Sequence, residues 1–97
     1  MYLKEGQKEE YRRRHQELWP EVAALLKSAG ISEYSIFLDE QSHALFAVQT
    51  LSSHEGSQSL GQHKVIQEWW DYMADIMVVN PDHSPVSEEL EEMFYLK

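Results

Sequence analysis

The 97-residue sequence predicts an α+β domain, with elements in the order strand, helix, strand, strand, helix, strand. Apolar residues recur at spacings of three and four in residues 7–29 and 64–77, which is typical of one helical face. Residues 32–38 and 44–51 alternate as strands do, and residues 2–4 and 93–96 are short apolar segments at the ends. This order is the ferredoxin-like split βαβ arrangement, βαββαβ, in which helices cover one face of an antiparallel sheet.

The first helix is interrupted by a proline. Its apolar stripe includes Tyr11 and His15, which are one helical turn apart. The ring of Pro20 removes one helical hydrogen bond and pushes Trp19 away from helical backbone angles. We therefore expect a kink, with Pro20 at an early position of the second half. Gly30 follows at a position that suits the positive φ with which helices commonly end.

The two central strands form a predicted hairpin. Residues 39–42 are a short polar turn between the alternating segments 32–38 and 44–51. Alternation places Tyr34 on the face of the first strand opposite to Phe37. One face of the sheet is left without helices, so we expect that face to meet another surface.

The second half of the chain contains one clear helix, at 64–77. The polar segment 52–63 before it is expected to be irregular or a short helical lead-in, and residues 80–85 read as a loop. Ser84 can cap a short helical turn that begins with the following proline. Residues 93–96 are then expected to form the last strand.

Composition limits the possible partners of this chain. Apolar residues make up 42% and charged residues 26%, the balance of a soluble globular protein, and we expect residues 1–97 to form one domain. The net charge of −9 argues against nucleic acid or an anionic membrane surface as a partner. The absence of cysteine excludes disulfides and thiolate chemistry. No apolar run approaches the roughly 20 residues of a membrane span, so a cytoplasmic location is expected.

His15 is the sharpest candidate for chemistry. Residues 12–14 are arginines, whose charge would lower the pKa of the imidazole and favour the neutral ring. A neutral imidazole donates a proton from one nitrogen and accepts one at the other, as general acid–base catalysis requires. The alternative is a core histidine that is hydrogen-bonded to a neighbour. The spacing of the histidines predicts no metal site, and there is no glycine-rich phosphate loop.

Trp69 and Trp70 are adjacent and raise a geometric question. Neighbouring residues on a helix point about 100° apart, so both indoles cannot face the middle of one buried stripe. One ring is expected in the core, and the other at an edge, a cavity or a partner. A flat indole face also suits stacking against a sugar ring, so the pair is a candidate ligand platform.

Several blocks of this sequence, in order, resemble the L-rhamnose mutarotase family. They are Glu10-Tyr11-Arg12-Arg13-Arg14-His15, Leu18-Trp19-Pro20-Glu21, Tyr34-Ser35-Ile36-Phe37-Leu38-Asp39, Trp69-Trp70-Asp71-Tyr72-Met73 and Asn80-Pro81-Asp82-His83-Ser84-Pro85-Val86. The resemblance runs from about Tyr11 to Leu96, and the joint occurrence of the blocks makes it specific. One departure is the short stretch before Gly6, where members usually have a longer first strand.

The resemblance implies a homodimer in which two ferredoxin-like sheets meet through their open faces, a dimeric α/β barrel. It implies a cofactor-free, metal-free enzyme that interconverts the α and β anomers of L-rhamnose. The family's proton donor corresponds to His15, and its sugar-binding positions correspond to Tyr11, Tyr34, Trp69 and Trp70. The complementary base stays open between Tyr11, Tyr34 and an ordered water.

Two other functions stay open. The first is a cofactor-free monooxygenase on the same dimeric barrel, whose site should be wider and more uniformly apolar. The second is a non-catalytic small-molecule-binding dimerisation module, which would bind a sugar without needing His15. Accelerated exchange between sugar anomers distinguishes an active mutarotase from both alternatives.

Overall fold

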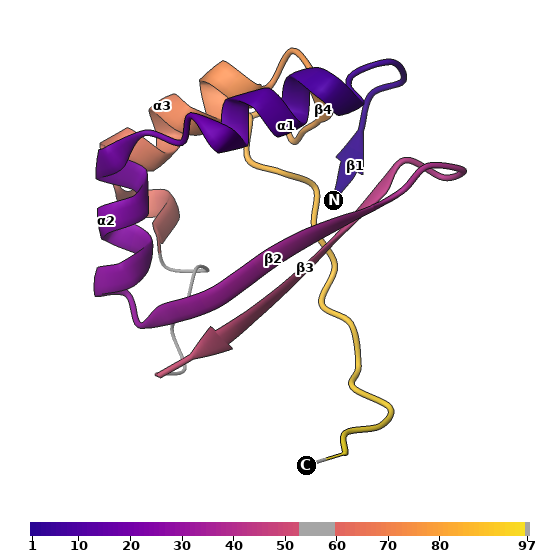
Figure 1. The fold of residues 1–97 in the computed structure, drawn as a ribbon. Coiled ribbons are helices and arrows are strands. Elements are labelled where there is room, and N and C mark those ends of the chain that lie inside the picture. Colours follow the sequence, from indigo (N-terminus) through magenta and orange to yellow (C-terminus); the bar gives the residue numbers. More distant parts are fainter. Residues whose placement is uncertain (53–59, 97) are drawn as a thin grey trace.

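The structure is a computed structural model that describes residues 1–52 and 60–96 (Figure 1). Its elements in chain order are β1 (Tyr2–Leu3), α1 (Lys8–Gln16), α2 (Pro20–Ser28), β2 (Ile31–Asp39), β3 (Ala44–Leu51), α3 (Lys64–Met73) and β4 (Met77–Val78). The strands pair antiparallel in the order β2-β3-β1-β4, with the helices on one side of the sheet (Figure 1). The predicted α+β class and ferredoxin-like arrangement are confirmed.

Pro20 separates the first helical region into two helices. It is the first residue of α2, and Trp19 before it has φ −59° and ψ 131°, an extended conformation. Residues 17–19 lie outside both helices, so the predicted kink is a full break. Gly30 follows α2 at φ +85°, and a Cβ atom there would lie 2.0 Å from the Ser52 hydroxyl oxygen. The predicted helix end at this glycine is therefore confirmed.

A bulge in β2 changes which residues face the helices. Ser32 pairs with Thr50 and Ser35 pairs with Val48, so Glu33 and Tyr34 both lie opposite one residue of β3. Glu33 has φ +49°, a backbone conformation that is uncommon for a residue with a side chain. The extra residue resets the alternation, so the odd-numbered Ile31 and the even-numbered Ile36 both pack into the core.

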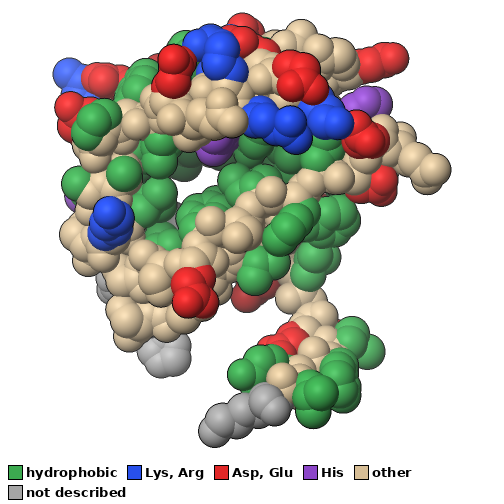
Figure 2. All heavy atoms as spheres, viewed as in Figure 1, with side chains coloured by type: hydrophobic (Ala, Val, Ile, Leu, Met, Phe, Trp, Pro, Cys, Tyr) green, Lys and Arg blue, Asp and Glu red, His purple; other side chains and the backbone are tan. Residues whose placement is uncertain are grey.

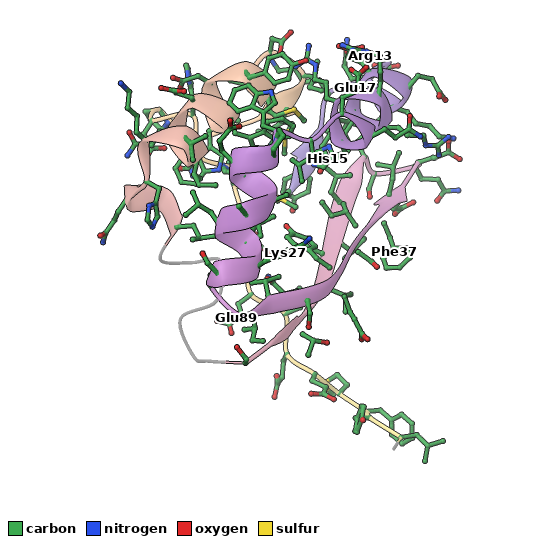
Figure 3. All side chains as sticks on the ribbon, turned by 60° about the vertical axis from the view of Figure 1, so that its left-hand side comes forward. Arg13, His15, Glu17, Lys27, Phe37 and Glu89 are labelled. Atoms are coloured by element: carbon green, nitrogen blue, oxygen red, sulfur yellow. The ribbon has the colours of Figure 1, made fainter. Side chains whose placement is uncertain are left out.

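The two faces of the sheet differ sharply. Leu3, Leu45 and Met77 face the helices and are buried in the core. The opposite face is apolar but exposed across all four strands, through Tyr2, Phe37, Phe46, Val48 and Val78. Phe37 is 59% exposed, and it lies on the side of the hairpin turned away from α2 (Figure 3).

The predicted helix over 64–77 is too long, because α3 ends at Met73. Ile76 and Met77 continue the apolar pattern, but their backbones bond to the segment that contains β1. Lys4 donates its backbone N–H to the Ile76 oxygen at 2.9 Å, and Met77 pairs with Leu3. The backbone of β1 needs a partner, so strand pairing prevails over the helical pattern.

Two further predictions near the C-terminus are wrong. Ser84 caps no helical turn; its backbone oxygen instead accepts the Asn80 N–H at 2.8 Å and closes a tight turn, after which Pro85 pairs with Val79. Residues 93–96 form no strand, and β4 takes that place in the sheet. The segment 86–96 extends away from the rest of the chain, where no described strand pairs with it (Figure 1).

The segment before α3 is described only at its two ends. The predicted lead-in at 52–63 falls partly outside the described residues, whereas residues 60–62 form one 3₁₀ turn. Within residues 1–52 and 60–96, no helix has the length and apolar character needed to cross a membrane.

Candidate active site

The candidate site lies where α1 and α3 face the helix-covered side of the sheet. His15 comes from the end of α1 and points into the space between the helices and the β2–β3 hairpin (Figure 3). The space-filling view shows a hollow between these two layers (Figure 2). The side chains around His15 are mostly aromatic, and they come from α1, α3 and the turn before α2.

Tyr11 fixes the orientation of His15 in two ways. The two rings stack with centroids 4.2 Å apart and an angle of 29° between their planes. The Nδ1 atom of His15 lies 3.0 Å from the Tyr11 backbone oxygen. That oxygen can only accept a hydrogen bond, so Nδ1 carries the proton and Nε2 is left to exchange a proton with a ligand.

Burial lowers the pKa of His15 below its ordinary value of 6.5, and the hydrogen bond to the Tyr11 backbone opposes this effect. The predicted direction is therefore correct, but the predicted cause is wrong. Arg12 and Arg13 are exposed and pair with glutamates of α1, and Arg14 pairs with Glu10 and with Asp75, just beyond the end of α3. Their charges are neutralised locally, so desolvation of the ring is the dominant cause.

Trp69 forms the inner wall of the site. It is buried in the core, and its ring meets His15 edge-on, with centroids 5.5 Å apart at 86°. Trp19 packs edge-on against Trp69 at 5.2 Å, and Tyr72 stacks on Trp19 at 5.6 Å. These contacts join the end of α1, the start of α2 and the face of α3 into one aromatic cluster.

Trp70 takes a separate position. Its ring lies against Gly61, where a Cβ atom would come within 2.7 Å of the indole. None of the ring contacts among residues 1–52 and 60–96 joins Trp70 to His15 or Tyr11. Trp69 is therefore the core member of the pair, and Trp70 is the half-buried member at its edge.

The two candidate tyrosines are neutral at ordinary pH. Burial raises the pKa of Tyr11, and the neighbouring Tyr34 raises it further. Burial also raises the pKa of Tyr34, although 38% of its surface is exposed. Both hydroxyls can therefore donate hydrogen bonds to a polar ligand, and ionising either one costs more than it does in water.

An open cavity of about 230 Å³ lies beside Tyr34, between α2 and β2. Leu18, Leu26 and Ile31 give it a largely apolar lining, and Glu33 stands at the bulge next to Tyr34. His15 does not line this cavity. The cavity therefore adjoins the candidate site without containing its proton-transfer group.

The comparisons with known proteins agree with one another. The family model for L-rhamnose mutarotase matches residues 1–96. An L-rhamnose mutarotase of Formosa agariphila is 57% identical over 97 residues, covering 100% of this chain and 93% of the relative. One from Bacteroides thetaiotaomicron is 53% identical over 96 residues, covering 99% and 92%.

This chain belongs to the L-rhamnose mutarotase family. A solved structure supports the same conclusion at the level of the fold: the crystal structure of an L-rhamnose mutarotase from Formosa agariphila superposes with a TM-score of 0.92 at 52% identity. The match covers 100% of this chain and 93% of that chain. The family resemblance read from the sequence is confirmed.

Within this L-rhamnose mutarotase fold, the predicted site residues are not equally close together. Tyr11, His15 and Trp69 are in direct ring contact, and Tyr34 is near enough to Tyr11 to affect its pKa. Trp70 stands apart on the next position of α3. The roles that the resemblance assigns to these residues stay predictions.

Sequence reasoning missed Trp19, Tyr72 and Arg14 as parts of the site. Tyr72 follows Trp69 by three residues, a spacing that places both on one helix face, so this signal was available. The sequence signals at Trp19 are its place before Pro20 and its part in the Leu18-Trp19-Pro20-Glu21 block, and neither predicts contact with Trp69. Arg14 follows Tyr11 by three residues, so the same spacing places it on the face of Tyr11, whereas its ion pair with Asp75 beyond α3 has no signal in the sequence.

Proposed function

We propose that this chain interconverts the α and β anomers of L-rhamnose. The relatives and the solved structure that it matches over nearly its whole length carry the name L-rhamnose mutarotase. The observation that carries the mechanism is the fixed tautomer of His15, whose Nδ1–H is bonded to the Tyr11 oxygen at 3.0 Å. The Nε2 atom is thereby the one ring nitrogen of His15 that is free to exchange a proton, within a partly buried aromatic site.

In the proposed reaction, His15 moves a proton to and from the ring oxygen of the sugar. Protonated Nε2 donates its proton to that oxygen as the bond from the anomeric carbon to the ring oxygen breaks, and the anomeric hydroxyl loses its proton. A free aldehyde forms, and the bond between C1 and C2 rotates. Nε2 then takes the proton back from the C5 hydroxyl as that oxygen attacks the other face of the carbonyl. The carbonyl oxygen at the same time regains the proton that the anomeric hydroxyl had released, so no atom or electron is gained or lost.

The lowered pKa of His15 suits this role. A depressed pKa makes the imidazolium a stronger acid toward a weakly basic ether oxygen. One positioned acid–base group supplies roughly 10²–10⁴-fold acceleration. Mutarotation already proceeds in water, so an effect of this size is sufficient and no further activating group is required by the chemistry.

Tyr11, Tyr34 and an ordered water are the candidates for the group that accepts the anomeric proton. A tyrosine would have to be ionised to act as the base, and burial raises the pKa of both Tyr11 and Tyr34. We therefore favour an ordered water as the acceptor. The two tyrosine hydroxyls then serve as hydrogen-bond donors to hydroxyl groups of the sugar.

Trp69 and Trp70 are proposed to bind the apolar side of the sugar. L-Rhamnose is a 6-deoxy sugar, so its methyl group and C–H bonds suit an indole surface. Trp69 contacts His15 and would form the inner wall, whereas the half-buried Trp70 would form the outer wall. Adjacent positions on α3 give the two rings different directions, which allows them to border one ligand from two sides.

We further propose that the protein is a homodimer that closes through the open sheet face. Phe37 and Val48 on that face are about 60% exposed, and the apolar residues Met93 and Phe94 of the C-terminal segment are more than 80% exposed. The segment stands clear of the rest of its own chain (Figure 2). Large contiguous apolar surface of this kind marks an interaction site, and a second copy supplies the matching surface.

The proposed location is the cytoplasm.

Anomer exchange measured by proton NMR tests the proposed reaction. Magnetisation transfer between the α and β anomeric signals of L-rhamnose should accelerate in proportion to added protein. An exchange rate that stays at the buffer value while the sugar binds would favour a non-catalytic binding module. No acceleration and no binding would favour a different substrate on the same barrel, such as that of a cofactor-free monooxygenase.

A further inference from the structure

Arg14 is the buried charged residue of this structure, and the proposed reaction does not use it. Only 8% of its surface is exposed, and no other charged side chain among residues 1–52 and 60–96 is buried to this degree. Its neighbours Arg12 and Arg13 have side chains that are 61% and 52% exposed. A buried guanidinium is costly unless every part of it is paired, so its partners indicate what it does.

The guanidinium of Arg14 joins α1 to the end of α3. Nη1 donates to the Tyr72 backbone oxygen at 2.8 Å and to Asp75 Oδ1 at 2.8 Å, and Nη2 donates to Asp75 Oδ2 at 3.2 Å. Nε donates to Glu10 Oε2 at 2.8 Å, on its own helix. The Arg14 Cζ atom also lies 4.5 Å from the centroid of the Tyr72 ring.

Arg14 lies on α1, and its contacts cap the C-terminal end of α3. The Tyr72 oxygen is among the last four carbonyls of α3, which have no partner within the helix. A cation at this end also faces the negative end of the helix dipole. The pairing persists at neutral pH, because the hydrogen bond from Arg14 lowers the pKa of the Asp75 carboxyl below its ordinary value. Arg14 is therefore a permanent, charge-assisted cap that α1 supplies to α3.

The cap stands next to the candidate site on both helices. On α1, Arg14 directly precedes His15. On α3, Tyr72 lies one turn after Trp69, and the two rings pack at 5.6 Å. The distance of 5.5 Å between the rings of His15 and Trp69 depends on how α1 sits against α3, and Arg14 bonds these helices directly, beside a contact of Arg13 with the Tyr72 side chain.

We propose that Arg14 is a positioning residue that sets the placement of His15 relative to Trp69. The proposal rests on the proposed function, since it gives the His15–Trp69 distance a catalytic purpose. Stability alone does not explain the residue, because an ion pair with a carboxylate that is 66% exposed contributes little to stability. The hydrogen bonds fix the orientation of α1 relative to α3 and the offset between the two helices. An apolar contact would allow both to vary.

Variants at three positions test the proposal. Arg14→Met removes the hydrogen bonds and keeps much of the volume, and Arg14→Lys keeps the charge but loses the two-pronged contact with Asp75. Arg12→Met is the matched control, because Arg12 is exposed and its ion pair with Glu9 is 3.9 Å long. The measurements are kcat and KM for anomer exchange, at a temperature where circular dichroism shows each variant folded. NMR shifts of the His15 ring protons, which feel the ring current of Trp69, are recorded in parallel.

The expected result is a fall of about 10- to 100-fold in kcat for Arg14→Met, since a displacement of about 1 Å can cost 10²-fold. Arg14→Lys should recover part of this loss, and Arg12→Met should stay within about twofold of the parent. The His15 ring protons should shift in Arg14→Met and stay in place in Arg12→Met. A folded Arg14→Met variant with parental kcat and parental shifts would overturn the proposal.

Two further variants distinguish a failure of the positioning role from misfolding and from a failure of the proposed function. If Arg14→Met does not fold, Asp75→Asn removes the charge of a carboxylate that is 66% exposed, and it should move kcat and the His15 shifts in the same direction. Parental values for Asp75→Asn would then refute the positioning role. If the parent protein does not accelerate anomer exchange, the proposed function fails, and if His15→Gln keeps full activity, only the proposed role of His15 fails. In either case the shifts of His15 in Arg14→Met still decide whether Arg14 positions the ring.

Discussion

The imidazole of His15 is held by the backbone of Tyr11, one helical turn earlier, through a 3.0 Å contact at Nδ1. The same two residues stack their rings, so both the tilt and the tautomer of the imidazole are fixed within one helix. A helix places residues four apart on one face, and this spacing alone brings the groups together. The orientation of the proton-transfer group is therefore set by contacts within α1, without contacts from the sheet.

The first prediction concerns the tautomer and the pKa of His15. In the folded protein, the ¹⁵N spectrum should show Nδ1 protonated and Nε2 free in the neutral ring. The ring should titrate with a midpoint below 6.5, because burial disfavours the charged form. A midpoint above 6.5, or a proton on Nε2 in the neutral state, would contradict the geometry described above.

The second prediction concerns stability and pH. The pKa of His15 is lower in the folded state than in the unfolded chain, so the unfolded state binds more protons between the two pKa values. This contribution to stability is complete above about pH 6.5 and is lost as pH falls through the folded pKa. Urea unfolding at a series of pH values should show the loss, and His15→Gln should remove that part of the slope. An unchanged slope in His15→Gln would show that other groups account for it.

The third prediction concerns the contact between Gly61 and Trp70. A methyl group at residue 61 would lie 2.7 Å from the indole, so Gly61→Ala must displace the ring or the turn. If Trp70 borders the sugar, the variant should raise KM several-fold with little change in kcat, because proton transfer at His15 is untouched. Tryptophan fluorescence should report the displacement. A displaced ring with parental KM would remove Trp70 from the proposed binding site.

The fourth prediction concerns the open sheet face. Phe37→Glu places a charge on the apolar surface, so a homodimer that closes through this face should dissociate in sedimentation analysis. Gln41→Glu, which adds the same charge in the exposed turn, is the control and should stay dimeric. Removing residues 90–97 tests whether the C-terminal segment also contributes. A parent protein that is monomeric, or a Phe37→Glu variant that is still dimeric, would contradict the proposed interface.

Much of the fold could be predicted because its signals are local. The break at Pro20, the positive φ at Gly30 and the polar turn between β2 and β3 each follow from the residue at that position. The alternation of apolar residues also predicted that Tyr34 and Phe37 lie on opposite faces of the hairpin. The bulge at Glu33 gave no such signal, because it depends on how β2 pairs with β3.

The errors arose where two distant segments compete for one place. Residues 77–78 and residues 93–96 are both short and apolar, and only the first pairs with β1. The sequence could not rank them, because the choice depends on the turn at 80–84 and on the length of α3. The site follows the same pattern: Tyr11 and His15 are predictable within one helix, whereas the burial of Arg14 depends on its contacts with α3.

The most direct test of the account is the rate of α to β exchange of L-rhamnose with His15→Gln, measured by NMR magnetisation transfer. Glutamine keeps a polar side chain of similar size but cannot transfer a proton in this way. We expect the enzyme-dependent rate to fall by roughly 10²–10⁴-fold in a folded variant that still binds the sugar. A His15→Gln variant that exchanges the anomers at the parental rate would contradict the central role of His15.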